Sequence, residues 1–169
     1  MNQIEKVSLE EMLEAREDRV IRQNTILKYD TDPLICFTLN IPGPVKTSVL
    51  YEDMFEAGIA KIERVLEENQ YRYLLRTKVR RKTGYEGYIS VCGNPEQIKE
   101  KMCGIEDGSA VGRIYDIDVL RDNGLKVSRE EIGKEPRKCL ICGEQAQVCG
   151  RNRTHSVGEL TAYIDKINF

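Results

Sequence analysis

The order of apolar and polar residues along the chain predicts an alternation of helices and strands. Ser8-Leu-Glu-Glu11 has the spacing of an N-terminal capping box, and the apolar residues that follow suit a long amphipathic helix ending near Lys28. Residues 34–41 form an apolar run typical of a buried strand, and from Ser48 the apolar spacing becomes helical again until about residue 69. The apolar positions of the first helix are Leu9, Met12, Leu13, Val20, Ile21 and Leu27.

The second half of the chain continues with further strands and shorter helices. The expected elements are strands at 71–81 and 85–92 joined across Lys82-Thr-Gly84, a helix at 95–102, a strand at 113–120, a short strand at 125–127 after the turn Asp122-Asn-Gly124, and helices near 144–149 and 156–167. We therefore expect a single α+β domain over residues 1–169. Its sheet should be mixed but mostly antiparallel, with about five strands flanked by helices.

Charge and apolar content narrow the classes of protein to consider. The chain has 26 basic and 28 acidic residues, so it lacks the overall field that draws a protein onto nucleic acid or an anionic membrane. Apolar runs such as Leu34-Ile-Cys-Phe37 are far too short to span a bilayer, and the N-terminal residues mix both charges. We expect a soluble, cytoplasmic protein whose six cysteines are thiols or metal ligands instead of disulfides.

An acidic pair stands in the predicted strand at 113–120. Because successive side chains of a strand point to opposite faces, Asp116 and Asp118 should emerge on the same face. Mg²⁺ is commonly held by one or two carboxylates together with substrate phosphates, which is the chemistry of nucleotidyl transfer. Gly108-Ser109 precedes the pair, in a loose match to the nucleotidyltransferase pattern at a shorter spacing. The alternative is an exposed strand face with two solvated carboxylates.

Three cysteines and the single histidine of the chain crowd together near the C-terminus. Cys139, Cys142, Cys149 and His155 have spacings that could close a tetrahedral Zn²⁺ site, so residues 139–155 are a candidate Cys/His-rich subsite. The alternative is a set of buried or spare thiols, with His155 serving as a helix cap or a catalytic base. A histidine that binds zinc cannot also act as a free base.

Basic residues at two places are candidates for binding phosphate. Arg137 and Arg151 are interleaved with the cysteines, and arginine suits bidentate recognition of phosphate, although a solvated basic surface would give the same pattern. Lys46 follows Pro42-Gly-Pro44 between the first strand and the second helix, where backbone N–H groups favour anions. The loop lacks the glycine spacing of a Walker A motif, and its alternative is a rigid turn.

Three motifs together resemble one known family. They are Pro42-Gly-Pro-x-Lys46, Gly112-Arg-x-x-Asp-Ile-Asp-Val-Leu120 and Pro136-Arg-x-Cys-Leu-x-Cys142, the last continuing through Cys149-x-Arg151 to Thr154-His155. In this order they closely resemble the holo-citrate lyase synthase family, the apo-citrate lyase phosphoribosyl-dephospho-CoA transferases. The likeness extends over nearly the whole chain from the first helix onward.

The resemblance implies a reaction and two partners. The phosphoribosyl-dephospho-CoA group of 2'-(5''-triphosphoribosyl)-3'-dephospho-CoA would pass to a serine of the acyl carrier (gamma) subunit of citrate lyase, with release of pyrophosphate. A zinc-stabilised, non-catalytic module that binds the carrier subunit or the precursor is the competing hypothesis. On chemical grounds the expected roles are Mg²⁺ ligands for Asp116 and Asp118, a phosphate contact for Arg113, phosphate or nucleotide contacts for Lys46, Arg137 and Arg151, and a zinc ligand or proton acceptor for His155.

Overall fold

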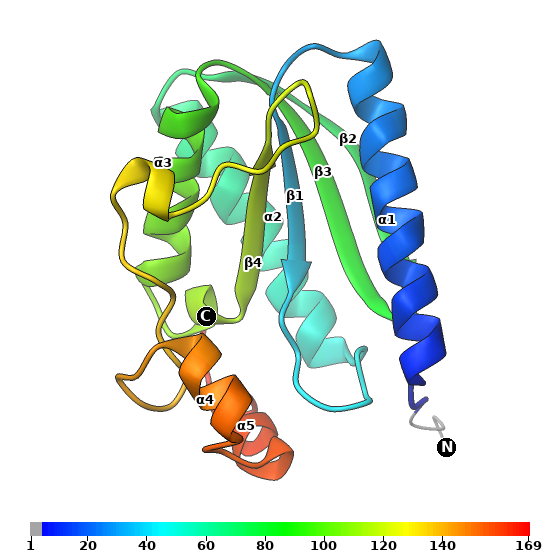
Figure 1. Ribbon diagram of the computed structural model, residues 1–169, viewed down its shortest axis with the longest axis vertical. Helices are drawn as coiled ribbons and strands as arrows, with labels where there is room; N and C mark the ends of the chain where they lie inside the picture. Colours follow the sequence, from blue (N-terminus) through cyan, green and yellow to red (C-terminus); the bar gives the residue numbers. More distant parts are fainter. Residues whose placement is uncertain (1–4) are drawn as a thin grey trace.

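The computed structural model describes residues 5–169 and confirms the α+β class (Figure 1). Its elements are α1 (Leu9–Tyr29), β1 (Leu34–Leu39), α2 (Val49–Glu68), β2 (Arg72–Arg81), β3 (Gly84–Cys92), α3 (Pro95–Asp107), the 3₁₀ turn η1 (Val111–Arg113), β4 (Tyr115–Leu120), the 3₁₀ turn η2 (Glu130–Ile132), α4 (Ala146–Asn152) and α5 (Val157–Ile164). Among these helices none has the length and hydropathy needed to cross a membrane.

The sheet has four strands in the order β2-β3-β1-β4, and every neighbouring pair is antiparallel. The succession β1-α2-β2-β3-α3-β4 with this order is the split βαβ, or ferredoxin-like, arrangement. The segment expected as a short fifth strand at 125–127 contributes one isolated bridge, between Lys126 and Leu120. It forms no strand because the chain turns away immediately after Val127.

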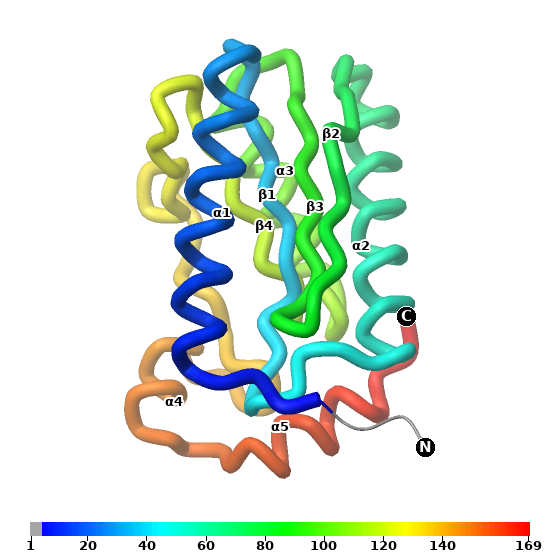
Figure 2. Tube along the Cα trace, turned by 90° about the vertical axis from the view of Figure 1, so that its right-hand side faces the viewer, coloured from blue at the N-terminus to red at the C-terminus, as the bar shows by residue number. Residues whose placement is uncertain are grey.

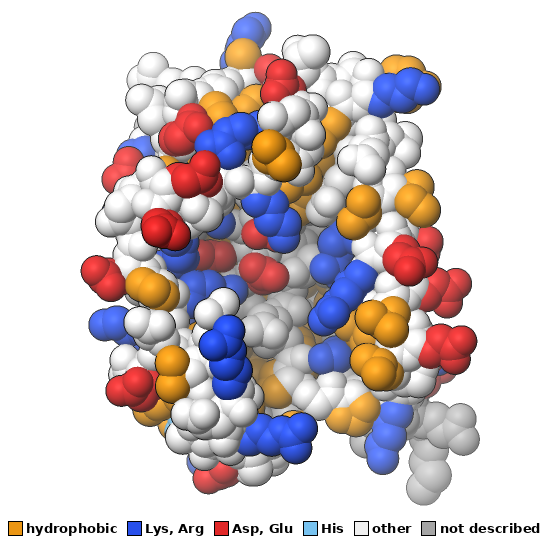
Figure 3. Space-filling view, in the orientation of Figure 1, with side chains coloured by type: hydrophobic (Ala, Val, Ile, Leu, Met, Phe, Trp, Pro, Cys, Tyr) orange, Lys and Arg blue, Asp and Glu red, His pale blue; other side chains and the backbone are white. Residues whose placement is uncertain are grey.

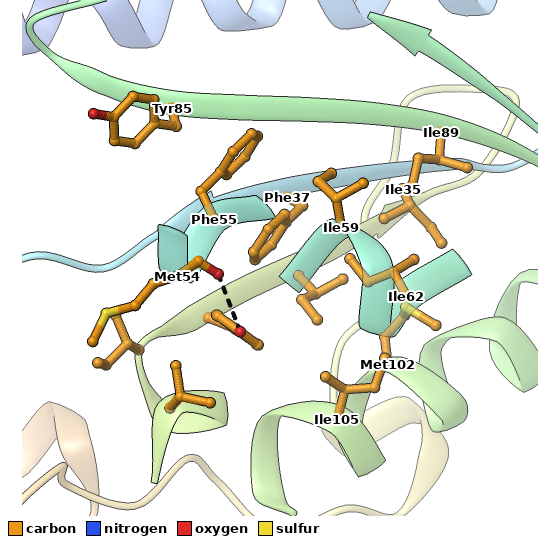
Figure 4. Close-up of a cluster of buried hydrophobic side chains, with 14 of the residues drawn as sticks. Ile35, Phe37, Met54, Phe55, Ile59, Ile62, Tyr85, Ile89, Met102 and Ile105 are labelled. Atoms are coloured by element: carbon orange, nitrogen blue, oxygen red, sulfur yellow. Dashed lines mark hydrogen bonds between the residues drawn. The ribbon is translucent and has the colours of Figure 1, made fainter. Parts of the chain in front are cut away.

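The main hydrophobic core lies between the sheet and helices α2 and α3. Phe37 of β1 stacks on Phe55 of α2 with ring centroids 5.3 Å apart, and meets the edge of Tyr115 at 5.1 Å (Figure 4). Gly58 permits this packing, because a Cβ there would lie 2.3 Å from Phe37 Cζ. The core therefore fixes β1 and β4 from one side and leaves their other side for the functional site.

Helix α1 covers part of the opposite face of the sheet, so that α1 and α2 lie on opposite sides of the strands (Figure 2). The predicted capping box is present: Glu11 N–H donates to the Ser8 hydroxyl at 3.2 Å, and Ser8 N–H donates to the Glu11 carboxylate at 2.9 Å. Below the helix, Ile26 and Leu27 pack against a small cluster with Leu34, Cys36, Tyr88 and Leu120.

The buried face of α1 differs from the one its apolar pattern indicates. Leu9 and Ile21 are 76% and 63% exposed, and Leu13 and Val20 are also exposed. The sheet instead receives arginines, because the carboxylate of Glu86 on β3 is buried and needs neutralising. Arg19 Nε and Arg22 Nη1 donate to it at 3.3 and 2.9 Å.

Candidate functional site

A hollow opens on the face of the sheet beside α1 (Figure 3). Acidic side chains lie on its floor, and Lys and Arg side chains line both sides. Asp116 and Asp118 alternate with the fully buried Ile117 along β4 and are both partly exposed on the open side, as strand alternation predicts. They pair in register with Thr38 and Cys36 of β1, so the acidic pair lies midway along the edge strand β4, beside β1.

The turn that precedes β4 depends on glycine. A Cβ on Gly112 would lie 2.3 Å from the carbonyl oxygen of Ile105, so only glycine allows α3 and β4 to approach this closely. The hydroxyl of Ser109 accepts a hydrogen bond from Gly112 N–H at 3.0 Å. Gly108-Ser109 thus serves the turn that aims β4, and its hydroxyl already has a backbone partner.

Each carboxylate of the acidic pair has a cationic neighbour. Lys126 Nζ lies 2.6 Å from Asp118 Oδ2, and Arg137 Nη1 lies 3.4 Å from Asp116 Oδ1. Burial, reinforced by the nearby charge of Asp118, raises the pKa of Asp116. Lys126 is a site residue that motif reasoning missed, and the Asp-Asn-Gly turn that folds residues 125–127 back onto β4 was the signal that could have found it.

Arg137 joins the acidic pair to the segment that leads into the cysteines. Its Nη2 donates to the carbonyl of Arg113 at 3.0 Å and also to that of Tyr115. Arg113 Nη1 in turn donates to the carbonyl of Cys139 at 3.5 Å. The two arginines therefore link the start of β4, the acidic pair and the Cys/His-rich subsite.

A groove of about 1730 Å³ extends from these arginines between residues 129–140 and helices α4 and α5. We call it the basic groove. Its lining includes Arg113, Arg129, Lys134, Arg137, Lys138, Arg153 and His155, with apolar surface from Pro42, Leu140, Val157 and Leu160. Six Arg and Lys side chains thus lie beside apolar surface in one groove, which suits a substrate that is polyanionic at one end and less polar at the other.

Two of the residues expected to contact phosphate lie outside this lining. Lys46 Nζ donates to the carbonyl of Ile41 in its own loop, and burial, together with the charge of Arg16, lowers the pKa of Lys46. Arg151 is exposed on α4 and is also absent from the groove lining. Of the expected basic residues, Arg137 contacts the acidic pair directly, and Arg113 is joined to it through Arg137, which donates to the Arg113 carbonyl.

A smaller cavity of about 620 Å³ lies between α1 and β2, away from β4. Its charged groups already have partners: Arg81 lies 2.5 Å from Asp18, and Arg76 is paired with Asp30. With its charges paired and none of the acidic pair or the cysteines on its lining, this cavity is a poor candidate for the chemistry.

The cysteine and histidine side chains expected to bind metal converge. The ligand atoms of Cys139, Cys142, Cys149 and His155 all lie within 4.8 Å of one another. Cys142 Sγ is 3.4 Å from both Cys149 Sγ and His155 Nε2. Because Zn–S bonds of about 2.3 Å require tetrahedral ligand atoms about 3.8 Å apart, this S₃N donor set fits Zn²⁺.

Backbone amides also prepare the cluster for a cation. Burial acts to raise the pKa of Cys139, but the N–H groups of Cys142 and Ile141 outweigh it and lower the pKa. A hydrogen bond with Cys142 raises the pKa of Cys149 to about 11. The thiolate therefore forms more readily at Cys139 than at Cys149, where a bound metal ion would have to displace the proton.

Fold and site together define an α+β protein with a carboxylate pair that is joined through Arg137 to a basic groove, an arrangement suited to polyphosphate substrates. The family model described as apo-citrate lyase phosphoribosyl-dephospho-CoA transferase matches residues 7–168. A Streptococcus pyogenes serotype M3 protein named "Probable apo-citrate lyase phosphoribosyl-dephospho-CoA transferase" is 40% identical, covering 96% of this chain and 86% of its own. Proteins named "Apo-citrate lyase phosphoribosyl-dephospho-CoA transferase" from Shigella boydii serotype 18 and Escherichia coli O157:H7 are 32% identical, covering 91% of this chain and 84% of theirs.

The chain belongs to the apo-citrate lyase phosphoribosyl-dephospho-CoA transferase family. The resemblance carried by the three motifs is therefore confirmed. All three motifs lie within the matched residues, and two of them, the acidic pair and the cysteine cluster, meet through Arg113 and Arg137.

Proposed function

We propose that this chain transfers the phosphoribosyl-dephospho-CoA group of 2'-(5''-triphosphoribosyl)-3'-dephospho-CoA to a serine of the acyl carrier (gamma) subunit of citrate lyase. The family match over residues 7–168 carries the proposal. The arrangement of the site supports it, because Arg137 contacts Asp116 and also lines the basic groove. A precursor lying in the groove would thus have its triphosphate beside the acidic pair.

The chemistry is nucleotidyl transfer. The serine oxygen forms a bond to the α-phosphorus, the bond from that phosphorus to the β-phosphate oxygen breaks, and pyrophosphate leaves as the serine proton is lost. Asp116 and Asp118 are the residues that would hold Mg²⁺, which when bound neutralises charge on the triphosphate. Arg113 and Arg137 bind the phosphate oxygens and keep the α-phosphorus facing the acceptor.

The cysteine cluster is proposed as a structural Zn²⁺ site. Structural zinc sites use four protein ligands and leave no open position, and the three thiols and His155 supply that set. His155 is then a ligand, not the proton acceptor for the serine. The metal would fix the carbonyl of Cys139, to which Arg113 donates, and so would hold the wall of the basic groove against the acidic pair.

The test is a transfer assay with the purified protein, Mg²⁺, the triphosphate precursor and the apo carrier subunit. We expect the carrier serine to gain the mass of the phosphoribosyl-dephospho-CoA group with release of one pyrophosphate. Asp116→Asn should abolish the reaction, whereas Asp122→Asn, an exposed carboxylate in the turn after β4, should not. A protein that binds the carrier and zinc but releases no pyrophosphate would support the competing hypothesis of a non-catalytic module.

A further inference from the structure

The backbone of Ile117, between the two aspartates, is held by charged side chains instead of by a neighbouring strand. Strand β4 lies at the edge of the sheet, so its outward peptide groups lack a strand partner. The N–H of Ile117 donates to Glu106 Oε1 at 2.8 Å. The carbonyl of the same residue accepts from Lys99 Nζ at 2.7 Å. Both side chains come from α3.

These two side chains are buried, which is costly for charged groups. Glu106 is 2% and Lys99 6% exposed, in the company of core residues such as Met102 and Ile105. Arg129 Nη2 lies 2.6 Å from the second oxygen of Glu106 and balances its charge. Water usually satisfies the outer groups of an edge strand, so pairing alone does not require buried ions here. Lys99 and Glu106 must therefore do something that water does not, namely hold the peptide groups of Ile117 in a fixed position.

The peptide groups beside Ile117 are held in the same way along the edge. The carbonyl of Tyr115 accepts from Arg137, and the carbonyl of Val119 accepts from Val127 N–H at 2.9 Å. Asp116 and Asp118 are therefore each flanked on both sides by residues whose outward groups are fixed. Because the direction of a Cα–Cβ bond follows from the adjoining peptide planes, the fixed edge sets where the two carboxylates point.

We infer that Lys99 and Glu106 are positioning residues that clamp Ile117, so that Asp116 and Asp118 present their carboxylates to one cation. This inference rests on the proposed function of the acidic pair. Two like charges on one face of an edge strand repel each other, and a strand that is paired on one side alone could twist to separate them. The clamp resists that twist from the core side, out of reach of substrate. Small misplacements of catalytic groups lower the rate by large factors. Buried charges that keep the two carboxylates in place would therefore increase the rate of transfer.

The clamp can be tested on the intact protein with Mn²⁺ as the probe. Lys99→Met removes the donor to the Ile117 carbonyl, and Glu106→Gln weakens the contact to its N–H. The matched controls are Lys101→Met, exposed on the same helix, and Glu68→Gln, exposed at the end of α2. Mn²⁺ binding is followed by electron paramagnetic resonance and the Ile117 amide by hydrogen exchange.

We expect both clamp variants to raise the Mn²⁺ dissociation constant about 10- to 100-fold, as is typical when the groups that orient metal ligands are lost. The kcat of transfer should fall in both variants. In Lys99→Met the KM for the precursor should stay near the wild-type value, because Lys99 does not line the basic groove. The Ile117 amide should exchange faster in Glu106→Gln. Lys99→Arg, which keeps a donor, should recover part of the loss, and the controls should match the wild type.

The outcomes separate the clamp from the proposed function. A wild-type protein that binds no Mn²⁺, with Asp116→Asn behaving identically, would reject the metal role of the pair and the mechanism built on it. A wild type that binds Mn²⁺ just as its clamp variants do would overturn the clamp alone. If neither Lys99→Met nor Glu106→Gln folds, Lys99 and Glu106 are structural residues, and this result would also overturn the clamp.

Discussion

Replacing Cys142 by serine should remove a stabilising metal site. Its sulfur occupies the centre of the cluster, 3.4 Å from both Cys149 Sγ and His155 Nε2. A serine hydroxyl is a poor zinc ligand at neutral pH, so the variant keeps three of the four donors and an incomplete coordination shell. The expected result is loss of zinc and of the stability that zinc gives to the folded chain.

The size of the effect follows from the geometry of the cluster. The four ligand atoms lie within 4.8 Å of one another, so reaching the roughly 3.8 Å spacing of a zinc tetrahedron requires small side-chain shifts. A ligand at 1,000 times its dissociation constant stabilises the folded state by about 4.1 kcal/mol. Since 1 kcal/mol shifts the Tm of a chain of this size by about 2–4 °C, zinc should raise the Tm by about 8–16 °C.

The assay is thermal unfolding of wild type and variant with and without a chelator, beside elemental analysis for zinc. Cys92→Ser is the control, because Cys92 is exposed on β3 and lies outside the cluster. Chelator should lower the Tm of the wild type and of Cys92→Ser to that of Cys142→Ser. A wild type that contains no zinc when purified under reducing conditions, and whose Tm does not change when zinc is added, would show that the cluster is not a zinc site.

Three further predictions concern the core, the acidic pair and the basic groove. Gly58→Ala should lower the free energy of unfolding by about 1–3 kcal/mol, because the new Cβ would lie 2.3 Å from Phe37 Cζ. Gly104→Ala is the control, since a Cβ there has no neighbouring atom within 4 Å and should not destabilise the protein. Equal denaturant midpoints for the two variants would contradict the prediction. Asp116 has a raised pKa, so protonation favours the folded state and this contribution is lost as pH rises through the folded pKa. Asp116→Asn should therefore raise the free energy of unfolding at neutral pH, by under about 1 kcal/mol because the side chain is 44% exposed. The transfer activity of the wild type should decline on acidification at a higher pH than the pKa of an ordinary aspartate would give. Arg137→Lys should raise the KM for the precursor about tenfold, because one ammonium group cannot replace the guanidinium contacts to both Asp116 and the strand carbonyls. An unchanged KM would show that Arg137 does not contribute to binding the precursor.

The elements that pack against the main core follow closely from the sequence. The residues that bury α2 recur at helical spacing, and β1 is a continuous apolar run, so their pattern and their burial coincide. The sequence also predicts helix α1 and its capping box. It does not predict which face of α1 is buried, because Glu86, which is buried and more than sixty residues away, pairs with Arg19 and Arg22 and leaves Leu9 and Ile21 exposed.

The site shows the same division between local and long-range causes. Strand alternation is local and is enough to put Asp116 and Asp118 on one face. The cysteine spacing is nearly local and indicates a cluster. Lys126 on Asp118, and Lys99 and Glu106 on Ile117, arise from contacts between separate elements. The Asp-Asn-Gly turn indicates the first of these contacts, because it folds residues 125–127 back onto β4. No local pattern indicates the contacts to Ile117, which depend on the packing of α3 against β4.

The mass of the carrier subunit after incubation with the protein, the triphosphate precursor and Mg²⁺ tests the central claim most directly. We expect one phosphoribosyl-dephospho-CoA group on one serine, one pyrophosphate released per carrier, and no product with Asp116→Asn or when chelator removes the Mg²⁺. Full transfer by Asp116→Asn, or transfer unaffected by removal of Mg²⁺, would contradict the role given to the acidic pair.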